Sequence, residues 1–433
     1  MAPPLWIFAG YYWLSLFTRG VYLPGIPISL NQAFFLAFFA AAARWLFSGR
    51  AGCAAAARMP DGGRRASVSA PIVRQWTFVL AAGLGAYYVV SALAGESPEM
   101  GARAAKTAAT LPALALALAA LCDSPSRMRM AAWGIVGPSL LQTAVALAEA
   151  ALRRDFFGGQ TDFHGPFFRV NGVAPNAIVF AQQCLFAAPL ALWLATASEG
   201  ALPRRSAFFS SMILFGVSLL TFNRQTIAMA PALALLAAWL FGGRLGRTML
   251  LAGAVGGAAL FPVAAPALLA RMRTLKNLDT DWSYHWRKDN FLNAMQVAKA
   301  YPWFGCGLGS YGAVWWPVRS LDTFFLQYAW MWEKQEPDMS YARMAAEMGV
   351  VGLSVNLAFF ALAIAALWRA RHRARRRGLE EWRDFASALL ALWALFLLSC
   401  ATQDALLYIR TWLLFGFTAR AVAASRGERP ADA

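Results

Sequence analysis

The sequence predicts an all-α polytopic membrane protein with about twelve transmembrane helices and one long outer loop, 269–341, that contains short helices. Three observations predict this fold class. Hydrophobic residues make up 59% of the 433 positions, and the mean hydropathy is +0.47, which excludes an ordinary soluble globule. The apolar residues form continuous runs of roughly 20 residues, the length that crosses a bilayer as a helix. These runs are rich in Ala and Leu and do not alternate with polar residues, so helices and not barrel strands are expected.

The apolar runs place the spans in chain order along the whole sequence. The expected ranges are 4–18, 28–47, 75–94, 104–122, 130–152, 174–197, 206–222, 225–242, 247–268, 342–368, 384–401 and 405–423. Only Asn223 and Arg224 separate the seventh run from the eighth, which predicts a tight helical hairpin. The N-terminus lacks a charged segment and a small-residue cleavage pattern, so the first run is expected to stay as a span.

The net charge of +17 resembles that of a nucleic-acid-binding protein, but the arginines lie in short loops between apolar runs. That distribution fixes the orientation of a membrane protein, and no nucleic-acid partner is expected. The arginine-rich set comprises the loops at 50–74, 127–129, 204–205, 244–247, 369–383 and 426–429. The positive-inside rule places this set and both termini in the cytoplasm. The 269–341 loop, the 153–173 loop and the turn at Arg224 then share the outer face.

Motifs for common cofactors and metals are missing from the sequence. The five cysteines show no paired spacing, and no acidic cluster has metal-ligand spacing, so we predict no disulfide framework and no metal site. No phosphate-binding loop of the GxxxxGK[ST] or GxGxxG type is present. The glycines at 305, 307 and 309 follow Pro302 and predict a sharp turn after a helical segment that ends near Ala300.

Three outer-face arginines are candidates for anion binding. Arg224 sits between two apolar runs at the membrane edge, where it is either a snorkelling residue or a preorganised clamp for an anion. The planar guanidinium fork suits a diphosphate because it donates two parallel hydrogen bonds. Arg287 lies in the first turn of an amphipathic segment, whereas its neighbour Lys288 is read as a solvated charge. Arg169 is either a third anion ligand or an interfacial charge.

Two carboxylates and the loop tryptophans complete the candidate site. Asp338 lies at the membrane edge, where it is placed to accept a proton from an incoming hydroxyl. Glu347 lies inside the following apolar run, where it is either part of the functional site or neutralises a neighbouring arginine. Trp286 and the other loop tryptophans either anchor the loop at the interface, which is the commoner role, or stack on sugar rings.

Four segments resemble, in order, the O-antigen ligase and polysaccharide polymerase superfamily, which comprises bacterial membrane glycosyltransferases of the GT-C type. They are RVNGVAPNAIVFAQ, LLTFNRQTIAMA, RKDNFLNAMQVAKAYPWFGCGLGSYG and PDMSYARMAAEMGVVG. Arg224 and Arg287 occupy the arginine positions of the second and third motifs. Asp338 occupies the position of the family's histidine, so the residue at this point departs from the family pattern. The resemblance divides the chain into N-terminal transmembrane helices, 1–160, and a ligase-like catalytic region, 161–425, that includes the periplasmic loop 269–341.

The resemblance implies transfer of a glycan from an undecaprenyl-diphosphate-linked donor to an acceptor hydroxyl at the periplasmic face of the inner membrane. The implied roles are diphosphate binding by Arg224 and Arg287 with help from Arg169, and a catalytic base or acceptor-orienting residue at Asp338. Glu347 and Trp286 are expected to contact the substrate, and no cofactor is expected. The acceptor is a glycan or lipid-linked glycan of the cell envelope, and ligase and polymerase stay open. The alternatives are a transporter or flippase of a lipid-linked or anionic glycan, and a scaffold whose loop binds a partner.

Overall fold

The computed structural model describes residues 76–154, 156, 170–174, 176–273, 281–320 and 336–426, with a few positions among residues 5–12 and 37–40. Within these residues every regular element is a helix, as the sequence predicts. The helices are α3 (Trp76–Leu93), α4 (Pro98–Leu121), α5 (Pro125–Leu152), α6 (Ala177–Ala197), α7 (Ala201–Leu219), α8 (Arg224–Phe241), α9 (Gly243–Arg273), α10 (Trp282–Ala300), α11 (Tyr311–Val318), α12 (Ser340–Arg376), α13 (Glu380–Cys400) and α14 (Ile409–Ala424).

The number of membrane spans is the part of the fold prediction that is not confirmed. In the described part of the chain, seven helices are long and apolar enough to cross a membrane, namely α3, α4, α5, α6, α8, α12 and α13. Helices α7, α9 and α14 coincide with predicted spans but fall outside this group. Helix α14 has only 16 residues, arginines occupy the start of α7, and α9 is described only in part. The first two predicted spans lie largely outside the described residues.

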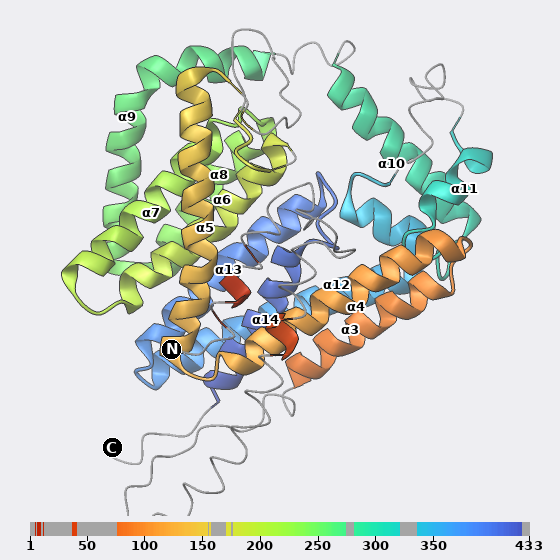
Figure 1. Ribbon diagram of the computed structural model, residues 1–433, viewed down its shortest axis with the longest axis horizontal. Helices are drawn as coiled ribbons and strands as arrows, with labels where there is room; N and C mark the ends of the chain where they lie inside the picture. Colours follow the sequence, from red (N-terminus) through yellow and green to blue (C-terminus); the bar gives the residue numbers. More distant parts are fainter. Residues whose placement is uncertain are drawn as a thin grey trace, which may run out of the picture.

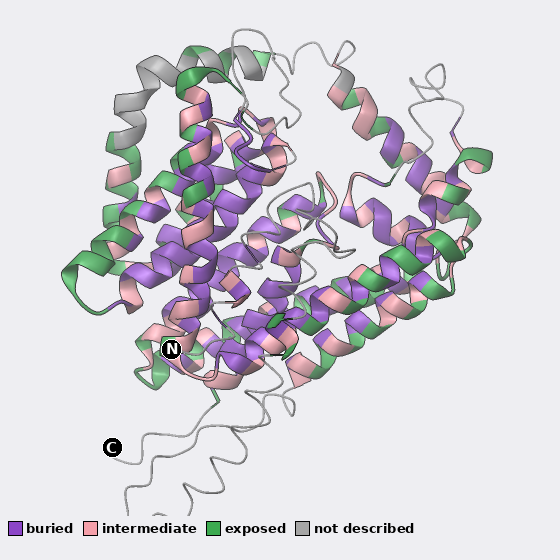
Figure 2. Cartoon of the chain, viewed as in Figure 1, coloured by how far each residue is buried: buried purple, intermediate pink, exposed green. Residues whose placement is uncertain are grey.

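Helices α6 and α13 form the centre of the bundle, where most of their residues are buried (Figures 1 and 2). Helices α5, α7 and α8 pack around α6, and α9 packs on α8. On the other side, α4 packs on α3 and α14. Aromatic rings fill the contact between α12, α13 and α14, where Trp393 stacks on Phe415 with ring centroids 5.3 Å apart. Burial of such rings contributes much of the packing energy of a helical core.

The long loop between α9 and α12 contributes two helices, α10 and α11, that dock on the first turns of α12. Their shared apolar cluster includes Val297 from α10, Tyr311 and Trp315 from α11, and Ala342 and Ala346 from α12. Helix α10 ends at Ala300, directly before Tyr301 and Pro302, which confirms the helix end that the sequence predicts. Docking α10 on α12 fixes the start of the loop against the point where the chain re-enters the membrane.

Helix α12 is broken at Gly349, which adopts φ 65° and ψ −168°. Its next two amides leave the helix: Val350 N donates to Pro302 O at 2.8 Å, and Val351 N donates to Trp303 O at 3.1 Å. The carbonyls of Ala346 and Glu347 accept instead from the amides of Cys306, at 3.1 Å, and Gly307, at 2.8 Å. The turn at 302–307 therefore inserts into the break, and the exchange satisfies the backbone groups that a gap in a buried helix leaves open.

We expect Gly349→Ala to destabilise the protein strongly. A Cβ at this position would lie 2.4 Å from the carbonyl carbon and oxygen of Trp303, and the backbone conformation itself costs a side-chain residue about 1–3 kcal/mol. Gly137→Ala in α5 is the matched control, because nothing lies within 4 Å of its Cβ position. Thermal unfolding in detergent micelles measures both, and a Gly349→Ala protein as stable as the control would contradict the account of the break.

Candidate functional site

Asp338, Arg287 and Trp286 come together where α10 meets the start of α12. Asp338 lies two residues before α12, and Trp286 and Arg287 lie in the second turn of α10. Burial raises the pKa of the Asp338 carboxyl, while the charge of Arg287 and a hydrogen bond from Trp286 partly offset that rise. Arg287 Nη1 also donates to Ser283 Oγ at 2.8 Å, which orients the guanidinium on the helix surface. The sequence names these three residues as candidates, and the structure brings them into one place.

Arg224 is the first residue of α8, where it forms an ion pair with Asp281. The sequence predicts that it sits in a two-residue turn, but α7 already ends at Leu219. Phe222 takes a positive φ of 48°, and Asn223 caps α8 by accepting from Gln225 N at 3.2 Å. These local features end one helix and start the next, so the connection is longer than expected and Arg224 belongs to the second helix.

Asp281 ties Arg224 to the start of α10. It is the N-cap of α10, accepting from Ser283 N at 3.0 Å and Tyr284 N at 3.3 Å. Burial would raise the pKa of Asp281, but the hydrogen bond and charge of Arg224 and these two amides outweigh that effect, so the pKa lies below its usual 3.8. Since a helix rises about 1.5 Å per residue, Arg287 lies roughly 9 Å further along α10. Arg224 and Arg287 therefore flank the first turns of one helix.

Glu347 lies fully buried in α12, where Arg343 Nε donates to its Oε2 at 2.8 Å. Arg343 is itself only 2% exposed, and its Nη1 contacts Asp404 at 2.6 Å and Glu336 at 3.3 Å. One buried arginine thus holds three carboxylates from three parts of the chain. Of the two roles considered for Glu347, the structure displays the pairing with a neighbouring arginine.

Arg343 and Asp404 are residues that sequence reasoning did not single out. The spacing of Arg343 and Glu347, four residues apart on one helix, is a signal that pairs opposite charges on a helix face. Nothing in the sequence joins either of them to Asp404, which sits in the turn between α13 and α14. That turn is held by Ser340, whose backbone amide donates to Gln403 O at 3.2 Å.

The loop tryptophans divide by burial. Trp303 is 68% exposed and Trp315 is 3% exposed. Trp315 is therefore part of the packed cluster that α11 forms with α10 and α12, and it serves neither as an interfacial anchor nor as a sugar platform. The remaining candidates Arg169, Trp330 and Trp332 lie outside the described residues.

A cavity of about 610 Å³ opens beside the Arg343 cluster. Helix α4 forms one wall with Ala104 and Thr107, and the turn before α14 forms the opposite wall with Asp404 and Tyr408. The cavity falls in the volume range of small-molecule sites. Among the described residues, no group of three or more His, Cys, Asp or Glu side chains could hold a metal ion.

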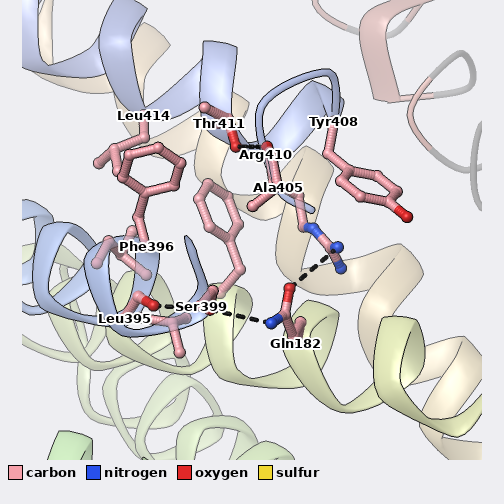
Figure 3. Close-up of a pocket in the computed structure, with 11 residues that line it drawn as sticks. Gln182, Leu395, Phe396, Ser399, Ala405, Tyr408, Arg410, Thr411 and Leu414 are labelled. Atoms are coloured by element: carbon pink, nitrogen blue, oxygen red, sulfur yellow. Dashed lines mark hydrogen bonds between the residues drawn. The ribbon is translucent and has the colours of Figure 1, made fainter. Parts of the chain in front are cut away.

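A second, smaller pocket lies deeper in the bundle between α6, α13 and α14 (Figure 3). Arg410 points into it, donating to Val179 O at 2.9 Å and to Gln182 Oε1 at 3.4 Å. Gln182 in turn donates to Ser399 Oγ at 2.9 Å. Its volume of about 30 Å³ admits roughly one water molecule. This pocket is too small for a sugar or a diphosphate, so its polar residues tie the helices together.

Residues 209–357 match the family model described as O-antigen ligase. This region of the chain belongs to that family. The O-antigen ligase domain contains Arg224, Arg287, Asp338 and Glu347, and it ends before Asp404. No curated protein matches the chain. A solved structure described as "Structural coordination of polymerization and crosslinking by a peptidoglycan synthase complex" contains a chain that is 18% identical. That alignment covers 82% of this chain and 98% of the other, with a TM-score of 0.44.

Proposed function

We propose that this O-antigen ligase-type membrane protein transfers a glycan from an undecaprenyl-diphosphate-linked donor to an acceptor hydroxyl at the periplasmic face. The observation that carries the proposal is the meeting of Arg287 and Asp338 between α10 and α12, inside the ligase domain. A cation and a carboxylate that interact electrostatically supply what the reaction needs: charge stabilisation for a leaving diphosphate and a proton acceptor for a hydroxyl.

In the proposed reaction the acceptor oxygen attacks the anomeric carbon of the donor sugar. The bond between that carbon and the phosphate oxygen breaks, and the lipid diphosphate leaves with the electron pair. The hydroxyl proton passes to Asp338. Arg287 and Arg224 bind the diphosphate oxygens, whose charge grows as the bond breaks. Asp281 acts as a positioning residue, because its ion pair with Arg224 fixes the direction of that guanidinium.

The distribution of arginine along α12 supports a periplasmic site. The helix begins next to Asp338 and ends with Arg373, Arg375 and Arg376. Its 37 residues are long enough to cross a hydrocarbon core of about 30 Å, so its two ends lie on opposite sides. The positive-inside rule assigns the arginine-rich end to the cytoplasm, which leaves the Arg287–Asp338 end outside. In this proposal the activated donor supplies the free energy, and neither metal nor nucleotide takes part.

Reconstitution tests the proposal directly. The purified protein is placed in proteoliposomes with an undecaprenyl-diphosphate oligosaccharide, and the product masses are measured. Ladders are expected from a polymerase, and single additions to a different acceptor are expected from a ligase. Movement of the donor across the bilayer without any new glycosidic bond would overturn the transferase and favour a transporter.

We expect the pH dependence of transfer to report the ionisation of Asp338. A base must be deprotonated, and burial raises the pKa of this carboxyl above its ordinary 3.8. Activity is therefore full above the raised pKa and is lost as the pH falls through it, so the acid limb lies above pH 3.8. Asp338→Asn should lower turnover by about 10²–10⁴-fold and remove that limb. A profile of kcat/KM against pH checks both, and undiminished turnover of Asp338→Asn would reduce the residue to a structural role.

A further inference from the structure

The cavity beside α4 has walls whose polar groups are fixed before any ligand enters. Asp404 Oδ2 accepts from Arg343 at 2.6 Å, and its Oδ1 accepts from Ser340 Oγ at 3.2 Å and from Leu406 N at 3.3 Å. Arg343 is locked between Asp404 and Glu347. Groups held in this way lose little conformational entropy on binding, which favours recognition of a ligand that forms directed hydrogen bonds.

The chemistry of the lining matches a sugar better than it matches a lipid chain or an anion. Carboxylates accept hydrogen bonds from hydroxyl groups, and arginines donate to hydroxyl and ring oxygens. Apolar and aromatic side chains, here Met100, Leu407 and Tyr408, suit the C–H faces of a sugar ring. The charged residues of the lining are Glu99, Glu336 and Asp404 against Arg103 and Arg343, which gives a net charge of −1. An anionic group is therefore disfavoured in this cavity.

The cavity also lies close to Asp338 along the chain. Glu336 lines the cavity. Asp338, two residues later, accepts a hydrogen bond from Trp286 and interacts electrostatically with both Arg287 and Asp404. Residues 336–339 thus lie between two polar regions: the Arg224–Arg287 side along α10, and the cavity along α4. Transfer needs this arrangement, because donor and acceptor must reach the base from different directions.

We propose that this cavity binds the acceptor glycan, and that it takes an uncharged, hydroxyl-rich sugar in preference to an acidic one. The proposal rests on the transferase function above and assigns the acceptor side of that site. The diphosphate of the donor occupies the arginines of α8 and α10, and the acceptor sugar lies between α4 and the turn before α14, with its hydroxyl directed to Asp338.

Thr107→Trp tests the cavity by filling it from α4, with Ala109→Trp as the matched control on an exposed part of the same helix. In the reconstituted system we expect Thr107→Trp to raise the KM for a neutral oligosaccharide acceptor at least about tenfold, a loss of roughly 1.4 kcal/mol of binding. Hydrolysis of the donor in the absence of acceptor is expected to stay unchanged, since it needs only the arginine side. Ala109→Trp is expected to match the wild type in both assays.

Glu336→Gln tests the charge preference, because it removes the charge of a carboxylate that is 67% exposed and keeps an oxygen that can accept from Arg343. We expect it to reduce the discrimination between a neutral acceptor oligosaccharide and the matching uronic-acid oligosaccharide. The same two oligosaccharides are used as probes in native mass spectrometry of the purified protein, which needs no turnover. Binding without transfer by the wild type would end the proposed function and leave the sugar site standing. An unchanged acceptor KM and unchanged binding in Thr107→Trp would overturn the sugar site. A fall in donor hydrolysis by Thr107→Trp as large as its fall in transfer would overturn it too.

Discussion

Replacing Arg287 by alanine is expected to abolish glycan transfer while the protein stays folded in the membrane. The guanidinium interacts electrostatically with Asp338 and is oriented by Ser283, so in the proposed reaction its removal takes a fixed cation away from the leaving diphosphate. Loss of one such donor from a preorganised site lowers turnover by about 10²–10³-fold. Arg224→Ala is expected to have a similar effect, because Asp281 holds that second guanidinium at the start of the same helix.

The controls distinguish the loss of a side chain that binds the diphosphate from the loss of a positive charge alone. Lys288→Ala removes an exposed cation next to Arg287 and is expected to transfer glycan at the wild-type rate. Arg287→Lys keeps the charge but loses the planar fork, so it should recover only part of the activity. Size-exclusion profiles in detergent show whether each variant is folded. Wild-type turnover in both Arg224→Ala and Arg287→Ala would remove the proposed site.

The sequence predicts well those features that depend on a local pattern of residues. Apolar runs of the right length locate most of the helices, and the Tyr301–Pro302 pair locates the end of α10. It also names Arg287, Trp286 and Asp338 as candidate site residues, because the order of motifs in a known family carries information that a single segment does not. The run of glycines after Pro302 indicates a turn, but the insertion of that turn into α12 depends on Gly349, more than 40 residues later.

The sequence is a poor guide to long-range partners. Asp281 is an ordinary helix-capping residue in the sequence, yet in the fold it pairs with Arg224 across 57 positions. Asp404 reads as part of a short polar turn, yet it binds Arg343 across 61 positions. Such pairs are set by how helices pack, and charge alone does not choose among the many acids and bases of a chain. The number of spans stays a prediction, because the first two predicted spans lie largely outside the described residues.

The buried arginine on α12 gives the largest expected effect on stability. Arg343→Leu leaves Glu347, Asp404 and Glu336 without the cation that contacts all three at 2.8, 2.6 and 3.3 Å. Removing one partner of a buried ion pair costs roughly 3–5 kcal/mol, and here the fully buried Glu347 loses its cation. We expect a drop of several degrees in the apparent melting temperature in detergent, or loss of the monodisperse protein.

Two comparisons decide whether the Arg343 network has this role. Arg103→Ala breaks an ion pair of similar length, 3.0 Å, whose side chains are 80% and 83% exposed, and exposed pairs contribute little to stability. It should therefore unfold like the wild type. Arg343→Leu combined with Glu347→Leu should be more stable than Arg343→Leu alone, because it removes the buried carboxylate together with the lost cation. If the double variant is as unstable as the single one, the effect comes from packing at the start of α12, and the charges that hold the wall of the cavity contribute nothing measurable.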